Sequence, residues 1–143
     1  MVQKSLNILL VEDNADHVEL ILKALRDNNV LSEVHVVTSG EEAMDFLYRH
    51  GAYVDAARPG LILLDIKLPG MDGIEFLRRI KADPELKLIP VVVLSTSGGE
   101  KDIIKGYCCG ANSYIVKPVD FEHFVKVIKQ VKLYWMVVNS LPR

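Results

Sequence analysis

The chain has 143 residues, of which 50% are hydrophobic and 25% are charged, with a formal net charge of -2. These proportions are typical of a globular domain that buries about two-thirds of the surface of its unfolded chain. The small negative charge disfavours nucleic acid or an anionic membrane as the main partner. No apolar run approaches the ~18 residues of a membrane span, and the N-terminus does not resemble a signal peptide, so a cytoplasmic location is expected.

Strands and helices are predicted to alternate from the start of the chain. The continuous apolar run Asn7–Val11 predicts a strand that is covered on both faces. Apolar positions spaced i, i+3, i+4 and i+7 then predict a helix over residues 18–25. Val34–Val37 is the next predicted strand. The polar residues Glu33 and His35 alternate with its apolar ones, and this pattern favours an edge strand.

The middle of the chain continues the same alternation. Ser39 followed by Glu42 has the spacing of a capping box and predicts the start of a helix that runs through Tyr48. The long connection His50–Gly60 is expected to be a surface loop. After it, the apolar run Leu61–Leu64 predicts a buried strand.

The second half adds two further strands and three further helices. A Pro residue disfavours helical backbone in the residue before it, so the third helix is expected to end at the Asp83-Pro84 pair. The predicted elements are a helix at 74–80, a strand at Val91–Leu94, a helix at 103–108, a strand at Tyr114–Val116 and a long apolar helix at about 121–138.

Alternating strands and helices predict an α/β fold with a parallel sheet covered on both faces. Right-handed crossovers leave few topologies, and we expect a doubly wound, flavodoxin-like sheet of five strands in the order 2-1-3-4-5. The prediction is a single domain over residues 1–143, with no output domain.

Polar side chains follow four of the five predicted strands. They are Glu12 and Asp13 after the first strand, Asp65 after the third, Ser95 after the fourth and Lys117 after the fifth. Each has an ordinary explanation by itself, as a helix cap or a surface charge. Because the carboxyl ends of parallel strands meet at one edge, where such sheets bind ligands, their coincidence indicates a site.

The residue types narrow the chemistry of that site. Three carboxylates close together repel one another, and a bound cation removes this repulsion. Oxygen ligands without histidine or thiolate favour a hard ion, Mg²⁺ in particular. A metal ion, Lys117 and a hydroxyl group suit a phosphoryl group carried on Asp65.

Four motifs in the expected order, LLVEDN, LILLDIKLPGMDG, PVVVLSTS and NSYIVKP, resemble those of receiver domains of two-component response regulators. The resemblance covers nearly the whole chain. It implies transfer of a phosphoryl group from a histidine kinase or phosphotransfer protein to Asp65. It also implies Mg²⁺ held by Glu12, Asp13, Asp65 and the backbone carbonyl of Lys67.

The same resemblance implies roles for three further residues. Lys117 would pair with the phosphoryl oxygens, Ser95 would move towards the phosphate, and Tyr114 would move inward with it. Glu12 departs from the more usual aspartate, which leaves the strength of metal binding open. The segment LYRHGAYVD resembles a subgroup that includes the phytochrome-associated regulators of cyanobacteria, which places a light-sensing kinase among the candidate partners.

Three other functions are weighed against this one. A phosphatase or mutase with an aspartate nucleophile would resemble Asp-x-Asp, and Asp65 is followed by Ile66 and Lys67. In a flavodoxin-like carrier the loop VEDNAD would have to cradle a phosphate, which its acids would repel. A receiver that signals without phosphorylation usually lacks the aspartate or the lysine, and this chain has both. The resemblance therefore implies a signalling protein, not an enzyme, that acts on a downstream protein target.

Two further expectations concern assembly and the histidines. Six consecutive apolar residues, Leu133 to Val138, point all round a helix, so one face would remain exposed in a monomer. This predicts a homodimer through the fifth helix. The alternatives are that the connection His50–Gly60 or Leu141 covers this face, or that the helix docks another protein. The histidines are scattered without a partner in the sequence and are expected to be solvated rather than catalytic: His17, His35, His50 and His123.

Overall fold

The computed structural model describes residues 6–27, 32–66, 68, 70–95, 113–116, 126–130 and 133. Within these residues, five strands form one parallel sheet in the order β2-β1-β3-β4-β5, which confirms the predicted order and the predicted edge position of the second strand. The strands are β1 (Leu6–Val11), β2 (Ser32–Val37), β3 (Leu61–Asp65), β4 (Val91–Ser95) and β5 (Ser113–Val116).

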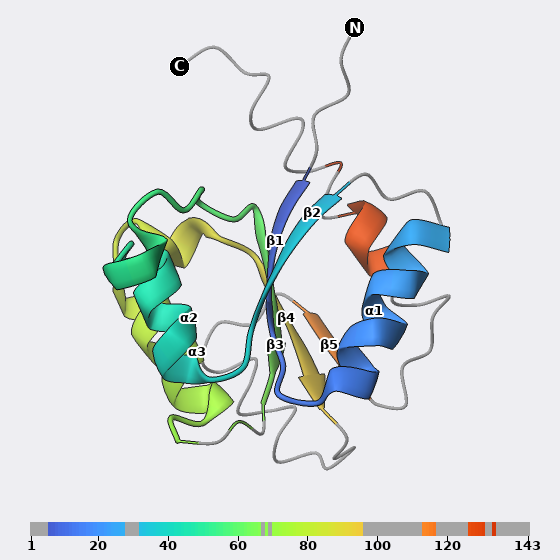
Figure 1. Ribbon diagram of the computed structural model, residues 1–143, viewed down its shortest axis with the longest axis horizontal. Coiled ribbons are helices and arrows are strands. Elements are labelled where there is room, and N and C mark those ends of the chain that lie inside the picture. Colours follow the sequence, from blue (N-terminus) through green and yellow to red (C-terminus); the bar gives the residue numbers. More distant parts are fainter. Residues whose placement is uncertain are drawn as a thin grey trace, which may run out of the picture.

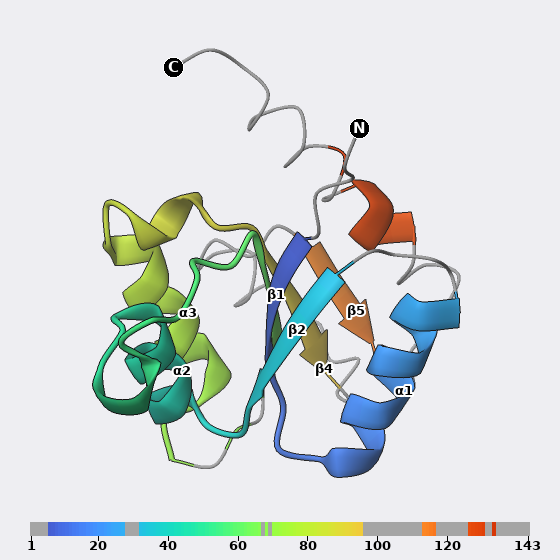
Figure 2. The same cartoon turned by 45° about the horizontal axis from the view of Figure 1, so that its top comes forward.

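Helices cover both faces of this sheet (Figures 1 and 2). Helix α1 (Ala15–Asp27) and the helical residues 126–130 lie on one face, and α2 (Gly40–Leu47) and α3 (Gly73–Ala82) lie on the other. The predicted helix at 103–108 and most of the one at 121–138 lie outside the described residues. Among the described helices, none has the length and apolar character that a membrane span requires.

The continuous apolar strands are explained by two separate cores. Successive side chains of a strand point to opposite faces, so alternate residues belong to different cores. Leu9 and Val11 pack with α2 and α3, whereas Ile8 and Leu10 pack with α1 and with Ile128. Each of these four residues of β1 is at most 1% exposed. The sheet is therefore a rigid support for whatever its strand ends carry.

The predicted helix starts and stops are present. The Ser39 hydroxyl accepts a hydrogen bond from the backbone N–H of Glu42, at 3.1 Å. The Glu42 carboxylate accepts in return from the backbone N–H of Thr38, at 3.2 Å, one residue earlier than in an ideal capping box. Helix α3 ends at Ala82, followed by Asp83 in extended conformation as its C-cap.

The connection 50–60 has more structure than the predicted surface loop. It contains a short 3-10 helix, η1 (Gly51–Tyr53), whose Tyr53 ring lies 5.3 Å from that of Phe46 in α2. The Arg49 side chain donates to the Ala56 carbonyl at 3.0 Å, and the Gly60 N–H donates to the Asn7 carbonyl at 2.8 Å. These contacts follow no regular spacing in the sequence, so local patterns do not reveal them.

Candidate functional site

The carboxylates predicted to meet at the sheet edge do so. Val11 of β1 pairs with Leu64 of β3, so Glu12 and Asp65 follow these two residues at the same level of the sheet. One carboxylate oxygen from each of Glu12, Asp13 and Asp65 lies within 4.8 Å of the others. Glu12 is 1% exposed and Asp65 7%, whereas Asp13 is exposed. We call these three residues the carboxylate cluster.

The sheet itself fixes the backbone of the cluster. The Glu12 N–H donates to the Val37 carbonyl of β2, and the Ile66 N–H donates to the Leu94 carbonyl of β4, each at 3.0 Å. The ladder thus continues one residue past β1 and β3. Glu12 is held by β2, and Asp65 pairs with Leu94 of β4, which restricts the backbone of both residues.

The Glu12 side chain is held by the start of helix α1. Its Oε1 atom accepts from the Asn14 backbone N–H and lies 3.3 Å from Nδ1 of His17, a residue that was expected to be solvated. Asn14 caps α1, because its side-chain oxygen accepts from the N–H groups of Asp16 and His17 at 2.9 and 3.2 Å. The prediction for His17 was therefore wrong: its ring is only 33% exposed and has a carboxylate partner.

The loop after Asp65 folds tightly against the end of β3. The Gly73 N–H donates to the Ile66 carbonyl at 3.0 Å, and a Cβ atom on Gly73 would lie 2.6 Å from the Ile66 Cα. Only glycine allows this approach. Gly70 has a φ of +71°, which also favours glycine. Both glycines thus allow the loop to fold closely beside Asp65.

Helix α2 holds the same loop from outside. Glu41 Oε1 accepts from the Met71 backbone N–H at 2.8 Å. Hydrogen bonds from its own backbone N–H and from that of Met71 lower the pKa of the Glu41 carboxyl below its ordinary value. Ionised Glu41 therefore stabilises the loop through its hydrogen bond with the Met71 N–H.

The carboxylate cluster fits a hard divalent cation. Two of its three carboxylates are buried, and buried carboxylates need paired charges, hydrogen bonds or a metal ion. Oxygen ligands on a rigid edge suit Mg²⁺, which retains several waters and takes one or two carboxylates from the protein. The donor set, the burial and the short separations thus agree on a Mg²⁺ site, as the sequence predicted.

The remaining predicted site residues are described only in part. Ser95 is the last residue of β4, and Tyr114 lies within β5, where its backbone pairs with Val93. Of both residues only the backbone is described. Lys67 and Lys117 lie outside the described residues.

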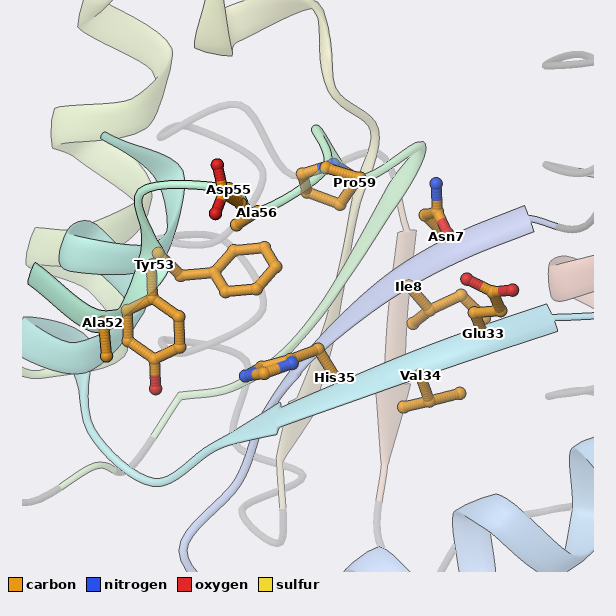
Figure 3. Close-up of a pocket in the computed structure, with 12 residues that line it drawn as sticks. Asn7, Ile8, Glu33, Val34, His35, Ala52, Tyr53, Asp55, Ala56 and Pro59 are labelled. Atoms are coloured by element: carbon orange, nitrogen blue, oxygen red, sulfur yellow. The ribbon is translucent and has the colours of Figure 1, made fainter. Parts of the chain in front are cut away.

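A separate pocket of about 370 Å³ lies beside the edge strand, next to the connection 52–59 (Figure 3). Asn7 and Ile8 at the start of β1 line it, whereas the carboxylate cluster follows the end of the same strand. His35 is exposed, as expected, and one side of its ring also packs on aromatic rings, 4.6 Å from Phe46 and 5.4 Å from Tyr53. Because the pocket lies at the start of β1 and the carboxylate cluster follows its end, the two are separate sites.

Known proteins share this arrangement over most of the chain. A family model described as the response regulator receiver domain matches residues 8–129. Response regulator Rcp1 of Synechocystis sp. is 39% identical over 135 residues, which cover 94% of this chain and 92% of Rcp1. A crystal structure of the phosphorylated cyanobacterial phytochrome response regulator RcpA superposes with a TM-score of 0.80 at 44% identity, covering 98% of this chain and 100% of RcpA.

A crystal structure of the Mn²⁺-bound form of Rcp1 superposes with a TM-score of 0.79 at 38% identity, covering 96% of this chain and 99% of Rcp1. The family match spans all three carboxylates of the cluster. The predicted resemblance, including its link to cyanobacterial phytochrome regulators, is confirmed.

Proposed function

Because the chain belongs to the response regulator receiver domain family, we propose that it accepts a phosphoryl group on Asp65 and signals through protein contacts. Proteins of this family interact with histidine kinases or phosphotransfer proteins, and receiver domains bind Mg²⁺ in an acidic cleft. The observation that carries the proposal is the carboxylate cluster, in which Asp65 is buried at a strand end with Glu12 and Asp13 beside it.

The geometry supports Asp65 as the nucleophile. It is the only member of the cluster that lies within a strand, and β1 and β4 flank that strand on either side. In the transfer, a carboxylate oxygen of Asp65 bonds to phosphorus while the bond from phosphorus to the donor nitrogen breaks and the imidazole leaves. Glu12 and Asp13 would hold Mg²⁺ with Asp65 and the Lys67 carbonyl, and the metal ion would neutralise charge on the phosphoryl oxygens.

Three residues complete the proposed switch. Lys117 follows β5 in sequence and would pair with the phosphoryl group. Ser95 ends β4, next to β3, and its hydroxyl would bind a phosphoryl oxygen. Tyr114, on the neighbouring β5, would change its side-chain conformation with Ser95, so that phosphorylation alters the surface offered to a partner.

The partner proposal follows from the relatives. The names of Rcp1 and RcpA describe response regulators, the latter of a phytochrome. A light-sensing histidine kinase is therefore the first candidate as phosphoryl donor, with a separate protein as the target. The remaining parts of the proposal are a cytoplasmic location, a single domain over residues 1–143, and a role as a phosphoacceptor without an enzymatic activity of its own beyond phosphotransfer and slow loss of the phosphoryl group.

A homodimer through the fifth helix is also part of the proposal. Val127 and Ile128 are 8% and 0% exposed and face the sheet, whereas Leu133 further along is 66% exposed. The support for a contact with a second copy is the apolar run Leu133–Val138 in the sequence, of which the exposed Leu133 is the first residue. Sedimentation should give a dimer at micromolar concentration that Leu133→Glu weakens. A monomer at high concentration, with and without phosphate, would contradict this part.

The direct test of the proposed function is incubation with Mg²⁺ and a small phosphodonor, followed by intact mass. The parent should gain one phosphoryl group, and chelation of the metal should prevent this. Asp65→Asn should gain none, whereas Asp55→Asn, at an exposed position beside the separate pocket, should behave as the parent. An adduct on Asp65→Asn would refute the assignment of the nucleophile.

A further inference from the structure

We propose that His17 is a positioning residue, which holds the Glu12 carboxylate in the orientation that divalent cations require and so raises the affinity of the carboxylate cluster for metal. The inference rests on the proposed function, because it concerns the same site. It goes beyond that function by assigning a role to a histidine that belongs to the first turn of α1.

Glu12 needs such a residue because of where it lies. Its side chain is 0% exposed, so bulk solvent does not hydrate the carboxylate and a protein donor is needed to orient it. A glutamate side chain also has one more rotatable bond than an aspartate, and a longer chain has more conformations in which its oxygens miss the metal. An outside partner must therefore select one conformation.

His17 and Asn14 supply that selection from one rigid place. Both contact the same atom, Glu12 Oε1, at 3.3 Å. Since a carboxylate only accepts hydrogen bonds, Nδ1 of His17 acts as the donor in this contact. Asn14 caps the helix through the His17 N–H, so the two donors are fixed relative to each other by the first turn of α1.

The role of His17 is indirect. The group of side chains close enough to share an ion consists, among the described residues, of Glu12, Asp13 and Asp65, and it does not include His17. His17 thus resembles the outer residues of known metal sites, which orient the ligands and whose loss lowers metal affinity by about 10–100-fold. The Asn14 N–H remains when His17 is replaced, so we expect the low end, about tenfold.

The test is the dissociation constant of Mn²⁺, measured by calorimetry on the full chain. His17→Ala should weaken binding about tenfold. His17→Asn should restore most of it, because the asparagine amide nitrogen can take the position of Nδ1 and donate to the same oxygen. His50→Ala is the matched control: His50 Nδ1 lies 3.6 Å from Asp45 Oδ1, but both side chains are exposed and lie outside the carboxylate cluster. This variant should bind Mn²⁺ as the parent does.

The metal-free melting temperature is measured for each variant, so that a folding defect is recognised separately. Unchanged Mn²⁺ binding in His17→Ala would overturn the inference while leaving the proposed function intact. Equal weakening in His17→Ala and His17→Asn would also overturn it, because the donor would then not be what matters. A parent chain that binds no Mn²⁺ would instead refute the metal site, and with it the proposed function.

Discussion

Replacement of Gly73 by alanine is expected to disturb the site without touching any of its carboxylates. Gly73 is the first residue of α3, and its backbone packs against the residue that follows Asp65. An alanine Cβ would lie 2.6 Å from the Ile66 Cα and 2.8 Å from the carbonyl oxygens of Asp65 and Ile66. All three atoms belong to the backbone, so no side chain can rotate away.

The size of the effect follows from these distances. Ordinary contacts of a Cβ begin at 3.4 Å, so the loop or α3 must shift by about 0.8 Å. Overpacking of this kind costs about 1–3 kcal/mol, and alanine recovers about 1 kcal/mol at most through its higher helix propensity, so the net loss is up to about 2 kcal/mol. At roughly 2–4 °C per kcal/mol for a domain near this size, the melting temperature should fall by up to about 8 °C. A shift of nearly 1 Å at a reacting group also slows a reaction by up to about a hundredfold.

The assay combines thermal unfolding with the rate of phosphorylation by a small phosphodonor at saturating Mg²⁺. Gly51→Ala is the matched control, because no atom lies within 4 Å of the Cβ it would add. Its φ of +57° makes alanine unfavourable there by about 1–2 kcal/mol, so the control also loses stability but should keep its phosphorylation rate. If Gly73→Ala keeps both the parent's melting temperature and its rate, the reasoning about this close approach is wrong.

Three further variants test other contacts. Asp13→Asn should raise the metal-free melting temperature, because one like charge leaves the carboxylate cluster, and should reduce the stabilisation by Mg²⁺; a lower metal-free value in thermal scans would contradict this. Glu41→Gln should lose less stability than the parent between pH 7 and pH 3 in urea titrations. The lowered pKa of Glu41 gives a stabilisation that is present above the pKa of Glu41 in the unfolded chain and is lost as the pH falls through its pKa in the folded chain. An equal loss in the variant and the parent would refute the role of the hydrogen bond from Met71. Ser39→Ala should cost about 1 kcal/mol of unfolding free energy through loss of the hydrogen bond to Glu42, and an unchanged urea midpoint would argue against that cap.

The carboxylate cluster could be predicted because strand ends of a parallel sheet converge by rule. Once the runs before Glu12 and Asp65 are read as neighbouring strands, the register brings the two carboxylates to the same level. The start of α2 was also predictable, since Ser39 caps this helix by accepting a hydrogen bond from the Glu42 N–H, and the two residues are close in sequence. At both places a general rule of strand or helix geometry was enough to predict the contact.

The contacts that were missed depend on side-chain conformation or on distant packing. His17 lies five residues after Glu12, a spacing that belongs to no regular element, and the contact forms only because the Asn14 cap turns the chain between them. The ring of Tyr53 packs on Phe46 because the connection 50–60 folds back over α2, and no local pattern indicates this. Tertiary structure decides such contacts.

The most direct test of the central claim is to locate the phosphoryl group. The parent chain is phosphorylated in Mg²⁺ and treated with borohydride, which reduces an aspartyl phosphate to homoserine, and its peptides are then mapped by mass. The account predicts homoserine at position 65 alone, and none when Mg²⁺ is omitted. Homoserine at position 13, or an unchanged peptide around position 65 in a chain that carries phosphate, would contradict it.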